Sequence, residues 1–273
     1  MIASLLLMVA LVFAAWSYGG VEPWALQWVQ MLALLGVAAL LPEARLRRQA
    51  EDAPASQDAQ PFFDWRWAAP PLALAAFVGV QALNASHLYT PGDEGLWPRP
   101  HLAWLPRSVS RGVSVESLLL LLTYAAIMAG CRAACPLRGR RLFFLGALLL
   151  SGSCMAVLVL MQRYVNPDPP RVMTGMFVNE NNYAAYANLL MPVALWLGRG
   201  FQRRAAVRLD RSHPGHLLYL AAGLLAASVL VSGSRSGILV TLGLFALWVT
   251  DELAHRRREG MPLDVPRLLA LAA

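Results

Sequence analysis

Apolar blocks separated by polar segments recur along the whole chain. Each block is close to the roughly 20 residues that an α-helix needs to cross the hydrocarbon core of a bilayer, about 30 Å thick. The stretch 212–250 is long enough for two such helices, and its only formally charged residue, Arg235, marks where they would meet. This pattern predicts an all-α, polytopic transmembrane helical bundle of about eight spans, with further apolar blocks at 2–16, 24–41, 67–83, 113–130, 142–161 and 183–198.

The chain ends in another apolar run, 267–273, which is typical of the start of a ninth span. Because the sequence stops inside this run, we expect an incomplete chain. Residues 42–66 form a polar linker, and 84–112 and 162–182 form two longer loops between predicted spans. We expect residues 1–273 to form a single integral membrane domain.

The composition agrees with a membrane protein, because 58% of the residues are hydrophobic and 14% are charged. Soluble domains have about 45–50% apolar and about 25% charged residues. The net charge is +7, and all 23 basic residues are arginines. These arginines lie beside the apolar blocks, so the basic charge does not indicate a nucleic-acid partner.

The arginines divide unequally between the two sets of alternating loops. Seventeen of them fall in one set, which includes the linker 42–66, and six fall in the other. Cytoplasmic loops of membrane proteins carry an excess of arginine and lysine. The distribution therefore predicts a cytoplasmic N-terminus and places the loops 84–112 and 162–182 on the opposite side of the membrane.

Two of the three cysteines, Cys131 and Cys135, are one helical turn apart, and the third is Cys154. A structural metal site needs four ligands of the cysteine or histidine type. No histidine or further cysteine lies near the first two in sequence, so we predict neither a metal site nor a cofactor.

Arginine and asparagine side chains gather in the non-cytoplasmic loops at 162–164, 171–183 and 232–237. Arginine keeps its charge and offers a planar fork of donors that suits phosphate oxygens. Asparagine is a good N-cap, and the free N–H groups of a helix N-terminus favour negative charge. The pattern predicts an anion site at the membrane surface, although interfacial anchoring by Arg163 and Arg171 and helix capping by the asparagines remain open alternatives.

Three of these stretches resemble a known family. The pattern Arg171-x-x-Thr-Gly-x-Phe-x-Asn-x-Asn-x-Tyr-Ala-x-Tyr186, followed by Met191-Pro192, resembles the signature of O-antigen ligases and O-antigen polymerases. Ser232-Gly-Ser-Arg-Ser-Gly237 resembles their turn of small residues, and Gly19-Gly-Val-Glu-Pro-Trp24 resembles their first outer loop. The three stretches occur in the order found in the family.

The resemblance implies a membrane glycosyltransferase of the bacterial inner membrane that acts at the periplasmic face. It implies a lipid-linked oligosaccharide donor on undecaprenyl pyrophosphate and an acceptor that is a glycan, a lipid A–core sugar of lipopolysaccharide, or a protein. It also implies metal-independent chemistry, periplasmic loops at 84–112 and 162–182, and a motif region at 171–250 that is truncated in this chain.

The resemblance also implies roles for single residues. Arg171 and Arg235, and then Arg163, are expected to contact the pyrophosphate, with Asn179 and Asn182 beside them. The catalytic histidine of the family lies in a later periplasmic loop, so we expect it beyond Ala273.

Two other functions use the same arginines. A transporter or flippase for a polysaccharide or a lipid carrier could hold a lipid phosphate without transferring a sugar. Such transporters often contain repeated halves, and this sequence shows no convincing internal repeat. A non-catalytic assembly partner is the third possibility.

Overall fold

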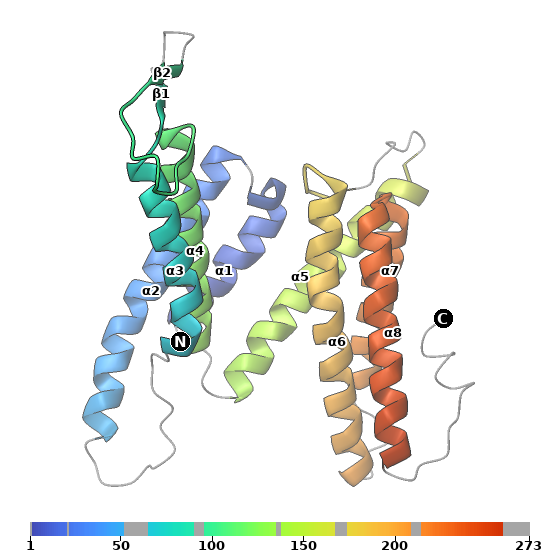
Figure 1. The fold of residues 1–273 in the computed structure, drawn as a ribbon. Coiled ribbons are helices and arrows are strands. Elements are labelled where there is room, and N and C mark those ends of the chain that lie inside the picture. Colours follow the sequence, from blue (N-terminus) through green and yellow to red (C-terminus); the bar gives the residue numbers. More distant parts are fainter. Residues whose placement is uncertain are drawn as a thin grey trace. The chain divides into compact units, whose positions relative to one another are not determined.

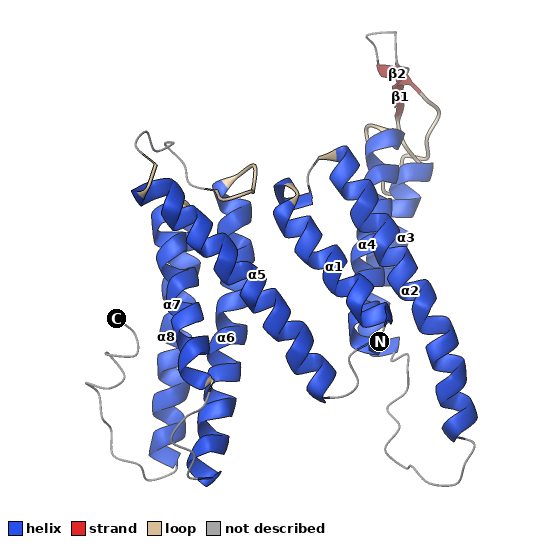
Figure 2. Cartoon of the chain, turned by 180° about the vertical axis from the view of Figure 1, so that it is seen from behind, coloured by secondary structure: helices blue, strands red, loops and turns tan. Residues whose placement is uncertain are grey.

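The computed structural model describes residues 2–20, 22–51, 65–89, 96–134, 138–166, 174–208 and 214–258. Within these ranges the chain is helical apart from one short pair of strands and the connecting loops (Figures 1 and 2). The helices are α1 (Ile2–Trp16), α2 (Pro23–Glu51), α3 (Trp65–Leu83), α4 (Arg111–Ala134), α5 (Arg138–Tyr164), α6 (Glu180–Arg208), α7 (Gly215–Ser232) and α8 (Arg235–Arg258), with a 3₁₀ turn, η1 (Tyr18–Gly20), and strands β1 (His87–Tyr89) and β2 (Leu96–Pro98).

The contacts divide the chain into two compact units. Unit 1 consists of Met1–Ala10 and Gln30–Arg140, and unit 2 consists of Leu11–Val29 and Arg141–Ala273. Each is described by itself below. Of the predicted linker 42–66, residues 42–51 continue α2, 65–66 begin α3, and 52–64 lie outside the described residues. Residues 167–173 and the predicted start of a ninth span at 267–273 also lie outside them.

In unit 1, α3 packs along α4, and the first turns of α1 contact α2 and α4. The contact with α1 depends on two glycines that face the fully buried side chain of Leu7. A Cβ atom on Gly36 would lie 2.8 Å from Cγ of Leu7, and one on Gly130 would lie 3.0 Å from its Cδ1. Small residues of this kind let helices approach closely in a membrane, where packing rather than the hydrophobic effect favours association.

The loop between α3 and α4 contains the only strands in the described part of the chain. β1 and β2 pair antiparallel, with Leu88 opposite Trp97. The hairpin extends beyond the ends of α3 and α4 (Figure 1). The sequence predicted a loop here and did not predict the strands.

In unit 2, α6 packs against α7 and α8, and the buried core also includes α5. Polar side chains in this core are paired across helices. Trp16 donates its indole N–H to the hydroxyl of Ser151 at 2.9 Å, and the Tyr183 hydroxyl donates to Ser228. Because an unpaired polar group is costly away from water, these bonds restrict how the helices can be arranged.

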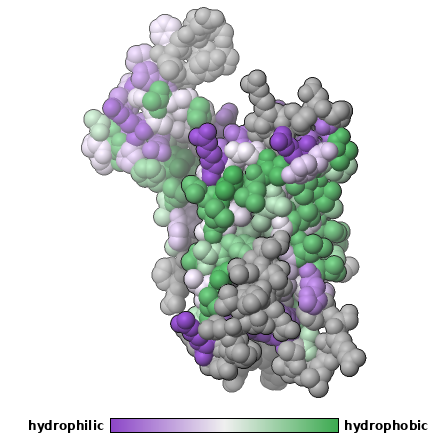
Figure 3. Space-filling view, turned by 90° about the vertical axis from the view of Figure 1, so that its right-hand side faces the viewer, coloured by the Kyte–Doolittle hydropathy of each residue, from purple (hydrophilic) through white to green (hydrophobic). Residues whose placement is uncertain are grey.

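Five helices in the described part of the chain are long and apolar enough to cross a membrane, which is the composition of a membrane-embedded protein. They are α2, α4, α5, α7 and α8. In Figure 3 apolar residues cover the middle of the visible face, and hydrophilic residues gather towards its ends. The count is lower than the predicted eight because α1 and the apolar part of α3 are short, and because α6 carries many polar residues.

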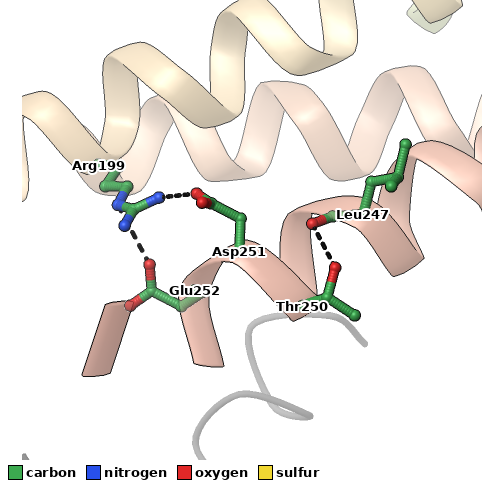
Figure 4. A network of polar contacts seen from close by, with 5 residues as sticks. All are labelled: Arg199, Leu247, Thr250, Asp251 and Glu252. Carbon is green, nitrogen blue, oxygen red and sulfur yellow. Dashed lines mark hydrogen bonds and ion pairs between the residues drawn. The ribbon is translucent and has the colours of Figure 1, made fainter. Parts of the chain in front are cut away.

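At the end of unit 2 where α8 finishes, an arginine of α6 binds two neighbouring carboxylates of α8 (Figure 4). The guanidinium of Arg199 contacts Asp251 through one terminal nitrogen, and its Nε lies 3.2 Å from a carboxylate oxygen of Glu252. The side chains of Arg199 and Glu252 are largely buried. This arginine, which the sequence placed among those that set orientation, therefore also ties α6 to α8.

We predict that Arg199→Ala lowers the Tm of the detergent-solubilised protein. The reason is that Glu252, whose side chain is largely buried, would lose the ion pair that stabilises its charge. Arg203→Ala, one turn further along α6 at an exposed position, removes the same charge and should shift the Tm less. Equal shifts for the two variants would show that net charge, rather than this ion pair, is responsible.

Candidate functional site

The turn between α7 and α8 places Arg235 at the first position of a helix. Gly233 ends α7 in the left-handed conformation, with φ of 87°, which glycine adopts at low cost. The hydroxyl oxygen of Ser234 then accepts a hydrogen bond from the N–H of Gly237 at 3.0 Å and caps α8. As the sequence predicted, two helices meet here, and Arg235 itself is exposed.

This turn is bound to the beginning of α6 through one side chain, Asn181. Its Oδ1 atom accepts hydrogen bonds from the hydroxyls of Ser234 at 2.7 Å and Ser236 at 3.2 Å. The two serines flank Arg235, so the position of this arginine depends on Asn181.

Two turns further along, α6 and α8 are joined by a second polar contact, which is buried. Asn188 donates from Nδ2 to the carbonyl oxygen of Gly237 at 3.0 Å. The hydroxyl of Thr241 lies 2.7 Å from Oδ1 of Asn188. Between the two polar contacts the helices nearly touch, because a Cβ atom on Gly237 would lie 2.4 Å from the Cβ of Ala184.

These contacts pair residues of α6 with residues at the beginning of α8, and the paired residues have the same sequence spacing in both segments. The spacing i, i+3, i+7 keeps residues on one face of a helix. The pairs are Asn181 with Ser234, Ala184 with Gly237, and Asn188 with Thr241.

The asparagine before α6 has a capping role. Oδ1 of Asn179 accepts a hydrogen bond from the N–H of Asn181 at 2.7 Å, as expected of an N-cap. This is one of the alternatives that the sequence left open. Asn182 is exposed. Contact of Asn179 and Asn182 with a substrate stays a prediction.

The stretch that leads into α6 is held against α5 by Gln162. Its carboxamide makes two hydrogen bonds with the backbone of Gly175, donating to the carbonyl oxygen and accepting from the N–H, each at 3.0 Å. Gly175 has φ of 62°, and a Cβ atom there would lie 2.8 Å from the sulfur of Met155. The neighbouring Arg163, near the end of α5, remains exposed.

The turn between α1 and α2 packs against the same stretch. A Cβ atom on Gly19, which has φ of 69°, would lie 2.7 Å from Cδ1 of Phe177. The ring of Phe177 also contacts the rings of Tyr183 and Tyr186, with centroids 5.9 and 5.3 Å apart. Only a residue without a side chain fits against this ring.

The structure thus brings together, at one end of unit 2, stretches that are far apart in the sequence. We call this the Arg235 end; it contains Gly19, Gln162, Gly175, Phe177, Asn181 and the turn Ser232–Arg235. Arg171 lies in 167–173, outside the described residues. Its proximity to Arg235 therefore stays a prediction.

Sequence reasoning missed the roles of Gln162 and Asn188. The sequence shows the same spacing at 181, 184 and 188 as at 234, 237 and 241. Spacing alone does not show which helices pair. In the part of the chain that the structure describes, no group of three or more histidine, cysteine or acidic side chains could hold a metal ion.

Comparisons with protein-family models, curated proteins and solved structures gave no match.

We predict that Gly237→Ala destabilises the protein by about 1–3 kcal/mol, the usual cost of overpacking a tight contact. The added methyl group would meet the Cβ of Ala184, which has no rotamer with which to move away. The matched control is Gly243→Ala in the same helix, where a Cβ atom has no neighbour within 4 Å.

The control variant should be neutral or more stable, because alanine is the better helix former. Thermal unfolding in detergent or nanodiscs measures both variants. If Gly237→Ala is as stable as Gly243→Ala, the close approach of α6 and α8 is wrong.

Proposed function

We propose that this protein is a membrane glycosyltransferase of the O-antigen ligase or polymerase type. It moves a glycan from undecaprenyl pyrophosphate to an acceptor at the periplasmic face of the bacterial inner membrane, with its N-terminus in the cytoplasm. The observation that supports this function best is the Arg235 end, where the three family-like stretches meet and leave Arg235 exposed.

The chemistry gives Arg235 a specific task. The acceptor hydroxyl attacks the anomeric carbon of the glycan, the bond from that carbon to the pyrophosphate oxygen breaks, and undecaprenyl pyrophosphate leaves with the bonding electrons. Groups already oriented towards the negative charge that develops on a leaving group lower the barrier. We assign this task to Arg235, whose two flanking residues, Ser234 and Ser236, are held by Asn181.

The hydroxyl proton needs a base. By resemblance this base is a periplasmic histidine, and the described residues are assigned donor binding only. Arg163 and Arg171 are proposed as further contacts to the pyrophosphate.

We propose this function for a chain that crosses the membrane about eight times. Hydropathy counts a helix as a span when its side chains are apolar, yet two polar side chains of α6, Asn188 and Arg199, bind α8. Asn188 of α6 is buried against α8. With 29 residues, α6 is about 43 Å long and exceeds the hydrocarbon core.

We predict that Arg235→Ala weakens binding of undecaprenyl pyrophosphate about tenfold or more, because hydrogen bonds to charged groups contribute about 1.5–3 kcal/mol each. Binding to the purified protein in nanodiscs can be measured by native mass spectrometry. The control is Arg203→Ala, which removes an exposed arginine from the opposite end of α6 and should bind like the parent.

Equal binding by Arg235→Ala and the parent would contradict the assignment of Arg235. Transfer of a glycan from a lipid-linked donor, measured on the full-length protein, separates the enzyme from a carrier. Tight binding without transfer would favour the transporter or flippase.

A further inference from the structure

One buried asparagine at the end of α3 organises the loop that leads into α4. The Nδ2 group of Asn84 donates to the carbonyl oxygen of Leu102 at 2.9 Å and lies 3.2 and 3.3 Å from those of Leu105 and Pro106. Its Oδ1 accepts the N–H of Leu102 at 2.7 Å. Asn84 is 8% exposed. Residues 102–106 are therefore tied to the end of the helix.

The next residues run beside the same helix end. The N–H groups of Ser86 and His87 donate to the carbonyl oxygens of Ser108 and Val109 at 2.9 and 3.1 Å. The hydroxyl of Ser108 reaches back to the carbonyl oxygen of Gln81, in the last turn of α3, at 3.3 Å. Residues 102–111, which we call the 102–111 segment, thus lie level with the end of α3, whereas the β1–β2 hairpin extends beyond it (Figure 1).

The 102–111 segment presents apolar side chains outward. Trp104 is 78% exposed, and Leu102 and Val109 are more than half exposed. Leu83 and Val113, at the adjoining ends of α3 and α4, are also largely exposed. In water this arrangement would be unfavourable, but tryptophan is enriched where a membrane helix meets the headgroups.

The same segment carries positive charge. Arg107 and Arg111 are both exposed. Every formally charged side chain in 84–89 and 96–112 is an arginine, and the two carboxylates of this loop lie in 90–95, outside the described residues. Arginine pairs well with phosphate oxygens, and a positive surface is attracted to a membrane that contains anionic lipid.

We propose that the 102–111 segment is an interfacial anchor that inserts into an anionic lipid bilayer. Trp104, Leu102 and Val109 occupy the boundary between headgroups and acyl chains, and Arg107 and Arg111 contact lipid phosphates. Asn84 is the positioning residue, because it holds the segment at the depth where α3 ends and α4 begins. This anchor is independent of the proposed glycosyltransferase activity.

Spin labels on the full chain in nanodiscs test this anchor. One label is attached at Trp104→Cys and, as a reference inside the bilayer, one at Leu119→Cys, which is exposed on α4 about 12 Å from its first residue. Both labels are placed in a variant in which Cys131, Cys135 and Cys154 are replaced by alanine.

We expect the label at 104 to collide more often with oxygen than with a water-soluble nickel chelate, at a depth near the phosphates and shallower than the label at 119. Frequent collisions with nickel, as for a label in water, would overturn the proposal and favour a protein partner or another part of the chain as the cover of this surface.

Two further measurements separate the parts of the proposal. Adding phosphatidylglycerol to phosphatidylcholine nanodiscs should slow the motion of the label at 104, and Arg107→Gln with Arg111→Gln should abolish this response. Asn84→Ala should release the label at 104 into water while the label at 119, which reports that α4 is still inserted, stays unchanged. An unaltered response in either variant would contradict the proposal.

Discussion

The pairing of buried polar groups between α6 and its neighbours is the constraint on which unit 2 depends. Asn188 must find partners because an unpaired carboxamide is costly in an apolar environment, and it finds them on α8 at Gly237 and Thr241. That contact is possible only because Gly237 has no side chain facing Ala184. These contacts fix the register of α8 against α6, and they therefore also fix where α8 begins.

The extent of the helices shows how far hydropathy predicts this fold. The block 183–198 became α6, Glu180–Arg208, and the block 24–41 became α2, Pro23–Glu51. Hydropathy marks the part of a helix suited to lipid, but arginine and alanine are good helix formers and continue the helix beyond it. The apolar blocks therefore located the helices but underestimated their length.

The candidate site was predictable in position but not in its contacts. The single charge in 212–250 correctly indicated a turn at Arg235, because an arginine is expensive within an apolar span. The contacts of Gly19 with Phe177 and of Gln162 with Gly175 could not be predicted. They join segments from separate helices, and the residue types involved fit many partners.

The small residues around Arg235 are explained by helix capping and packing. Ser234 caps α8 and binds Asn181, and Gly237 lets α8 contact α6. Because this turn packs closely against α6, its one charged residue, Arg235, lies outside the contact surface. An arginine facing Ala184 would have neither room nor a partner. The same constraint that specifies the helix register therefore leaves Arg235 exposed at this end of unit 2.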